Sequence, residues 1–118
     1  MAQRTAVALL VSFGLLALGS GRALARSPGT YLDYGAGQQS CGAWTSHFSS
    51  PGYHTVDQQW LLGFVSGTSY EGTVLSETDG NAITAWVDNY CAQHPLDNVA
   101  TAAGRLVDVL VRRAGEGR

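Results

Sequence analysis

The feature that most constrains this chain is its N-terminus, which has the three parts of a secretory signal peptide. Arg4 supplies a positive charge, and an uncharged apolar stretch over residues 6–18 follows it. Ala23-Leu24-Ala25 then offers the small-x-small pattern that signal peptidase accepts. We therefore predict a signal peptide over residues 1–25 and export to the periplasm. The alternative is an uncleaved membrane anchor, but the uncharged stretch over residues 5–21 is short for a helix that spans about 30 Å of hydrocarbon.

Export determines how the two cysteines are interpreted. In an oxidising compartment an even cysteine count indicates a disulfide, here Cys41 to Cys91. Closing a loop of about 50 residues stabilises a fold by roughly 4 kcal/mol in the chain-entropy model. The alternatives are a metal site or a catalytic thiol, which fit less well because the cysteines are far apart and no Cys-x-x-Cys spacing exists.

The mature chain is acidic and contains no lysine. It has nine Asp and Glu residues against five arginines, in a length that fits one domain. Without clustered Arg or Lys it is a poor nucleic-acid binder. Acidity suits a basic protein partner through electrostatic steering, although the same balance is ordinary for a soluble protein.

Hydrophobic periodicity predicts an all-α fold, a small compact bundle of about four helices with one long-range disulfide. Residues 26–39 are predicted to be a flexible leader, because they hold Pro28, Gly29, Gly35 and Gly37 and little apolar periodicity. The helical domain is expected over residues 40–114, followed by a tail over 115–118. No segment shows convincing strand alternation.

The first half of the domain predicts two helices. One begins near Ser40, with Cys41, Trp44 and Phe48 on one face, and ends at Ser49-Ser50-Pro51-Gly52. The next begins at Thr55, where Thr55 and Gln58 match a capping box and Asp57 adds negative charge to the first turn. The residues of its predicted apolar face are Val56, Trp60, Gly63, Phe64 and Gly67, and Leu61 and Val65 widen this face. Gly63 and Gly67 indicate either close approach of a backbone or ring, or the end of the helix near Gly67.

The second half predicts a surface loop and two further helices. The loop covers residues 68–79, and its last four residues resemble a capping box, Ser76 to Asp79. The third helix has the clearest stripe, which comprises Ile83, Trp86, Val87, Tyr90 and Cys91, with Asp88 opposite, and His94-Pro95 ends it. The fourth starts at Pro95 with Asp97 in its first turn and ends at Gly115. Its predicted stripe comprises Leu96, Val99, Ala103, Leu106, Val107 and Leu110.

Catalytic and metal-binding patterns are missing from the sequence. The histidines His47, His54 and His94 are not spaced as metal ligands, and no Gly-x-Ser-x-Gly elbow exists. Trp44, Trp60 and Trp86 lie on apolar helical faces and are expected in the core, the alternative being an aromatic ligand site. We expect no enzyme, no catalytic residue, no metal and no cofactor.

Several blocks in a fixed order resemble a known family. They are Ser40-Cys41-Gly42-x-Trp44, Gln59-Trp60-Leu61-Leu62-Gly63-Phe64-x-Ser66-Gly67, Ala85-Trp86-Val87-Asp88-Asn89-Tyr90-Cys91 and His94-Pro95-Leu96. Together they resemble the Rap/Tai-type immunity proteins of type VI secretion systems and related uncharacterised secreted proteins of proteobacteria. The likeness covers roughly residues 40–110.

This resemblance implies an all-helical periplasmic protein that binds and blocks a peptidoglycan-cleaving amidase. The matching residues are mostly core and disulfide positions, so they imply the scaffold and transfer no partner-binding residue. We therefore expect a protein partner, with a homodimer as one option. We expect no binding to nucleic acid and, after signal cleavage, none to a membrane. The layout also resembles Hde-type periplasmic acid-stress chaperones. A structural or envelope-stress protein without a single partner is a third alternative.

The predicted contact surface is the polar stretch between the second and third helices. Tyr70 offers an amphipathic anchor of the kind enriched at interfaces, and Glu71, Glu77 and Asp79 offer an acidic rim. The alternative is an ordinary solvated loop.

Overall fold

A computed structural model describes residues 32–117 of the chain. The predicted signal peptide and residues 26–31 of the predicted leader lie outside the described residues. The main helices are α1 (Cys41–Ser46), α2 (Pro51–Tyr70), α3 (Gly80–Gln93) and α4 (Val99–Glu116). Two short 3₁₀ helices, η1 (Gly35–Gln38) and η2 (His47–Ser49), flank α1. Residues 32–117 contain no β-strand, which confirms the all-α prediction over that part of the chain.

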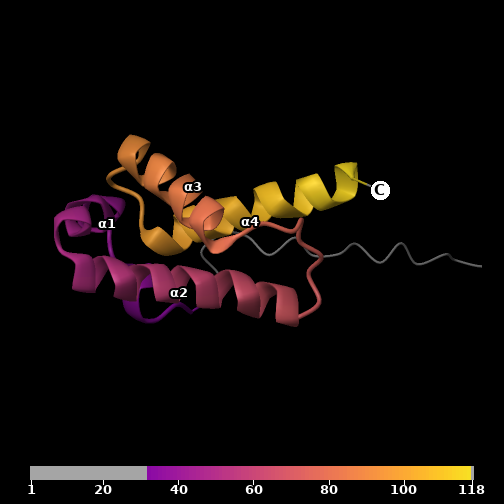
Figure 1. Cartoon of the computed structure of the whole chain (residues 1–118), viewed down its shortest axis with the longest axis horizontal. Helices are drawn as coiled ribbons and strands as arrows, with labels where there is room; N and C mark the ends of the chain where they lie inside the picture. The colour runs from indigo at the N-terminus through magenta and orange to yellow at the C-terminus, as the bar shows by residue number, and fades with distance from the viewer. Residues whose placement is uncertain (1–31, 118) are drawn as a thin grey trace, which may run out of the picture.

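The helices pack with α2 on one side of the molecule and α3 and α4 on the other, while α1 closes one end (Figure 1). The predicted disulfide is present, and Cys41 and Cys91 are fully buried where it joins α1 to α3. Trp44 is also fully buried, and its indole Nε1 donates a hydrogen bond to Asp88 Oδ1 at 2.7 Å. Asp88 therefore faces α1, although its position in the helical stripe predicted the opposite side.

Backbone hydrogen bonds join the start of α1 to the start of α4. Cys41 N donates to Asp97 O at 2.7 Å, and Val99 N donates to Gln39 O at 2.9 Å. These two bonds satisfy N–H groups in first turns, which have no partner within their own helices. They hold the two helix starts beside the disulfide.

Side chains cap three of the four helices. Ser40 Oγ accepts from Ala43 N at the start of α1, as predicted from Ser40. Asp79 Oδ1 accepts from Ala82 N at 2.8 Å, so the cap of α3 is Asp79 itself and the capping box predicted from Ser76 is wrong. Asn98 Oδ1 accepts from Thr101 N at 2.7 Å. The fourth helix accordingly begins at Val99, four residues after the predicted start.

Helix α2 begins at Pro51, earlier than predicted, and has no side-chain cap. Proline suits the first helical position because the amide hydrogen that it lacks would have no partner there. The predicted capping box of Thr55 and Gln58 is wrong, since Thr55 Oγ1 donates to Pro51 O within the helix. The helix also continues to Tyr70, past the end considered near Gly67.

The buried face of α2 differs from the predicted one. Its buried residues are Asp57, Leu61 and Val65, which follow one another at a spacing of four. Val56 is 63% exposed, and a Cβ added at Gly63 or Gly67 would meet no atom within 4 Å. Neither explanation offered for these two glycines is therefore correct: they are exposed and lie inside the helix.

Three smaller predictions also fail, two about buried apolar residues and one about the end of α4. Phe48 is half exposed, and Leu96 is 96% exposed in the turn before α4. Gly115 does not end α4, which continues to Glu116. Four residues of the predicted α4 stripe, Val99, Ala103, Leu106 and Leu110, are buried, and Val107 is half buried. Among the described residues, no helix is both long and apolar enough to cross a membrane.

Candidate functional site

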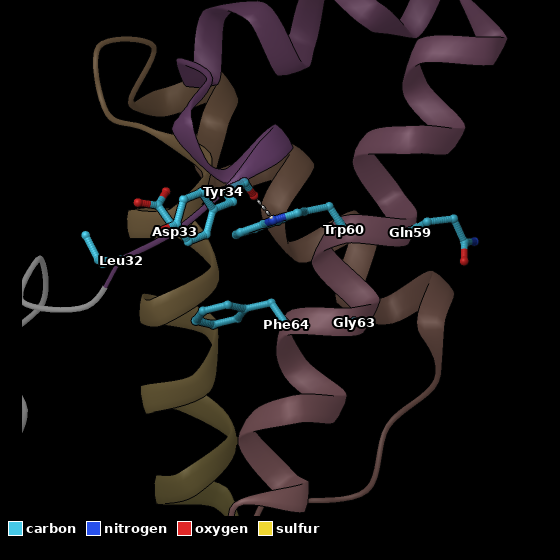
Figure 2. Close-up of a pocket in the computed structure, with 7 residues that line it drawn as sticks. All are labelled: Leu32, Asp33, Tyr34, Gln59, Trp60, Gly63 and Phe64. Carbon is cyan, nitrogen blue, oxygen red and sulfur yellow. Dashed lines mark hydrogen bonds between the residues drawn. The ribbon is translucent and has the colours of Figure 1, made fainter.

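One groove in the described part of the chain lies beside Trp60 on α2. The Trp60 groove has a volume of about 410 Å³. The residues that line it are Leu32, Asp33, Tyr34, Gln59, Trp60, Gly63 and Phe64. Trp60 and Phe64 project from α2 toward the Leu32–Tyr34 segment, one ring above the other (Figure 2). Their centroids are 5.4 Å apart with an interplanar angle of 20°. Because both rings are only partly buried, the groove presents aromatic surface.

Two glycines allow the chain to lie directly on the Trp60 ring. Gly35 has φ +75°, a conformation that side-chain-bearing residues rarely adopt. A Cβ at Gly37 would overlap the six-membered ring of Trp60. Trp60 Nε1 also donates to Tyr34 O at 2.5 Å, as the dashed line in Figure 2 marks. The end of the predicted flexible leader is thus packed on α2, with Ala36 and Gly37 buried.

Asp33 places an unpartnered carboxylate in the lining of this groove. Its Oδ2 is buried and accepts no hydrogen bond within residues 32–117. Only the backbone oxygen of Asp33 is used, as the acceptor for Gln38 Nε2 at 3.0 Å. Buried polar atoms nearly always have a partner, so this oxygen is unusual.

A second titratable cluster, which sequence reasoning missed, lies between η2 and α2. His47 Nδ1 is 2.6 Å from Asp57 Oδ2, and Gln39 Nε2 donates to Asp57 Oδ1 at 3.2 Å. Asp57 is 2% exposed, so these two partners satisfy a carboxylate in the core stripe of α2. A His–Asp pair can act as a general base. Asp57 also bridges two segments that precede its helix, which is a structural role.

A third cluster, between α3 and α4, surrounds Tyr90. The rings of Trp86, Tyr90 and His94 are stacked in succession along α3, and Tyr90 Oη donates to Asp97 Oδ2 at 2.6 Å. This hydrogen bond, together with burial and the Asp97 charge, raises the pKa of Tyr90, while Arg105 opposes the shift. Arg105 lines a shallow cavity of about 290 Å³ beside these rings.

The residues predicted to bind a partner are exposed but dispersed. Tyr70 is the last residue of α2 and is 89% exposed, and Glu71 follows it. Glu77 is exposed in the following loop, and Asp79 is occupied as the cap of α3. The loop is anchored between Glu71 and Glu77, since Ser76 N donates to Leu110 O at 3.1 Å. The structure therefore joins Tyr70 to the α2 surface and gives the three carboxylates no shared contact.

Within residues 32–117, no group of three or more His, Cys, Asp or Glu side chains is arranged to hold a metal ion. No protein-family model, curated protein or solved structure matches the chain.

Proposed function

We propose that this chain is a periplasmic protein that binds another protein through the outward face of α2, and that the partner is a cell-wall amidase toxin which it neutralises. The observation that carries the binding role is an exposed, uncharged helix face. Asp57 is the only Asp, Glu, Lys or Arg in α2, and it is buried. Tyr53, Val56 and Tyr70 are each more than 60% exposed.

This face has the composition of a protein interface. Aromatic residues are enriched and charges are depleted at interface cores. The Trp60 groove adds Tyr34 and the aromatic surface of Trp60 and Phe64 along the edge of the same helix. Exposed glycines let a partner approach the helix backbone closely, because they carry no side chain.

The choice of an amidase and of the periplasm depends on the sequence. The signal-peptide pattern supports export, and the buried disulfide is compatible with an oxidising compartment. The resemblance to Rap/Tai-type immunity proteins supports a peptidoglycan amidase as partner. Binding in this proposal uses the shape and the uncharged aromatic surface of α2 and requires no catalysis.

The direct test is capture from periplasmic extract with the disulfide-bonded protein as bait. Val56→Glu should abolish capture of an amidase, because it places a charge on the uncharged proposed surface. Tyr70→Ala and Glu71→Ala should weaken it, and Leu96→Glu is the matched control at an exposed position off α2. The immunity role is dropped if no envelope enzyme is recovered and deletion of the gene leaves cells fully resistant to attack by sibling cells.

An acid-stress chaperone is the second candidate, and one structural observation favours it. Three carboxylates tie separate segments together: Asp57 to His47, Asp88 to Trp44, and Asp97 to Tyr90. Strong acid weakens contacts that depend on ionised carboxylates, which loosens a fold. A client-aggregation assay at pH 2 tests this role. Retained compactness together with no protection of clients would eliminate it.

A further inference from the structure

We infer that the Trp60 groove binds the guanidinium group of an arginine side chain presented by a protein partner, with Asp33 as its counter-charge. The inference deepens the proposed function and rests on it in one respect, namely that a protein carries the arginine.

The first argument is the unsatisfied carboxylate of Asp33. Asp33 is half buried, and neither of its side-chain oxygens has a hydrogen-bond or ion-pair partner among residues 32–117. Withdrawing a carboxylate from water is costly unless a donor or a cation compensates. Among residues 32–117 no Lys or Arg lines the groove, so the described part of the chain supplies no such cation there. A cation from outside would compensate the carboxylate through Oδ1, since Oδ2 is closed to solvent.

The second argument is the aromatic surface next to that carboxylate. Cations are attracted to the faces of aromatic rings, and tryptophan attracts them most strongly. The stacked rings of Trp60 and Phe64 form one wall, and Tyr34, which is 72% exposed, stands across from them. A guanidinium is planar, stacks on aromatic rings and donates charge-assisted hydrogen bonds to a carboxylate oxygen. Arginine therefore uses both features of the groove, whereas the ammonium of lysine is a compact, strongly hydrated point charge.

The third argument is the charge of the surroundings. Residues 32–117 contain nine acidic side chains and three arginines. All three arginines lie on α4, between Arg105 and Arg113. The exposed face of α2 beside the groove carries no charge of either sign. The acidic field of the domain therefore favours a cation at the groove, with no fixed positive charge nearby on α2 to repel it.

The experiment is a titration of the disulfide-bonded protein followed through the indole N–H resonances of its tryptophans. The probe is an acetylated and amidated Gly-Arg-Gly peptide. The control is the same peptide with citrulline, which keeps the shape of arginine and removes its charge. Trp60→Phe assigns the relevant resonance. We expect the Trp60 signal to shift saturably with the arginine peptide, and the citrulline peptide to bind about fivefold more weakly. The signal of the fully buried Trp44 should stay in place.

Asp33→Asn tests the counter-charge. It should weaken the arginine peptide about fivefold, to the level of the citrulline peptide, while Glu116→Gln, which removes an exposed carboxylate at the end of α4, leaves the affinity unchanged. Circular dichroism should show both variants folded, because the hydrogen bond at Asp33 uses its backbone oxygen.

Three outcomes overturn the inference. Equal binding of the arginine and citrulline peptides would show an apolar groove without charge selection. Equal binding of a lysine peptide would remove the preference for a guanidinium. An unmoved Trp60 signal with every peptide would exclude the groove as a site. Under each of these outcomes, the protein could still capture a periplasmic partner and lose it in Val56→Glu. Failure of the groove is therefore distinguishable from failure of the proposed function.

Discussion

Helices α2 and α4 have similar lengths but distribute their apolar residues in different ways. Helix α4 buries Val99, Leu106 and Leu110 and exposes Arg105 and Arg112. Helix α2 buries the charged Asp57 in line with Leu61 and Val65, and exposes Val56. The pattern of α4 is explained by folding alone. Folding alone does not explain why α2 exposes apolar residues, and the proposed partner-binding role of its outward face does.

The largest expected effect is in the core of α4. Leu106→Ala should lower the free energy of unfolding by about 3 kcal/mol, because Leu106 is 3% exposed and the truncation leaves a cavity. Chemical denaturation measures this change. Val111→Ala, at a 40% exposed position on the same helix, should change the stability by less than about 0.5 kcal/mol. Equal losses for both variants would mean that the two faces of α4 are wrongly assigned.

The next effect tests the charge buried in α2. Asp57→Ala should destabilise the fold by about 2 kcal/mol, because it leaves His47 and Gln39 without their shared acceptor. The control is Asp108→Ala, an exposed carboxylate on α4. A denaturation midpoint that does not move in Asp57→Ala would show that the buried contact adds nothing.

A smaller effect is expected where the chain packs on Trp60. Gly37→Ala should cost about 1–2 kcal/mol, because the added methyl group overlaps the indole ring. Its tryptophan fluorescence should also shift to the red as Trp60 becomes more exposed. If stability and fluorescence both stay at the wild-type values, the Leu32–Gln38 segment does not pack on α2.

The smallest effect has the opposite sign. Gly63→Ala should stabilise the protein by about 0.5–1 kcal/mol, since the position is helical and a Cβ there meets no atom within 4 Å. Thermal unfolding should detect the increase. The same variant should also weaken partner capture, because the methyl group intrudes on the proposed interface. A loss of stability would show that Gly63 is packed against something within the fold.

The sequence predicted well those elements whose signals are local. The stripe of Ile83, Val87 and Cys91 predicted α3 and its buried face, and His94-Pro95 marked its end. The Cys41–Cys91 pairing followed from the count of two and from the inferred export. Ser40 was recognised as the residue that begins α1. For α1 and α3 the local sequence pattern was sufficient, because propensity, periodicity and packing agree there.

The prediction of α2 failed because its buried residue is charged and its exposed residues are apolar or small. Periodicity assigned Val56 and Gly67 to the apolar face, and Asp57 was interpreted only as a negative charge in the first turn. Asp57 can be buried because His47, ten residues earlier in the chain, supplies a partner for its carboxylate. The candidate site was missed for a related reason. Gly35 and Gly37 indicate a flexible segment in sequence, and only the position of Trp60 shows that they provide close packing.

By itself the sequence determined the helical class, the disulfide and the core faces of α3 and α4, since these depend on spacing along a single helix or on a pair of cysteines. Tertiary structure alone decided which face of α2 is buried, what the leader glycines contact, and where an unpartnered carboxylate meets aromatic rings. Those features depend on residues that are distant in the chain, such as Asp33 and Trp60, and no local pattern records which of them meet.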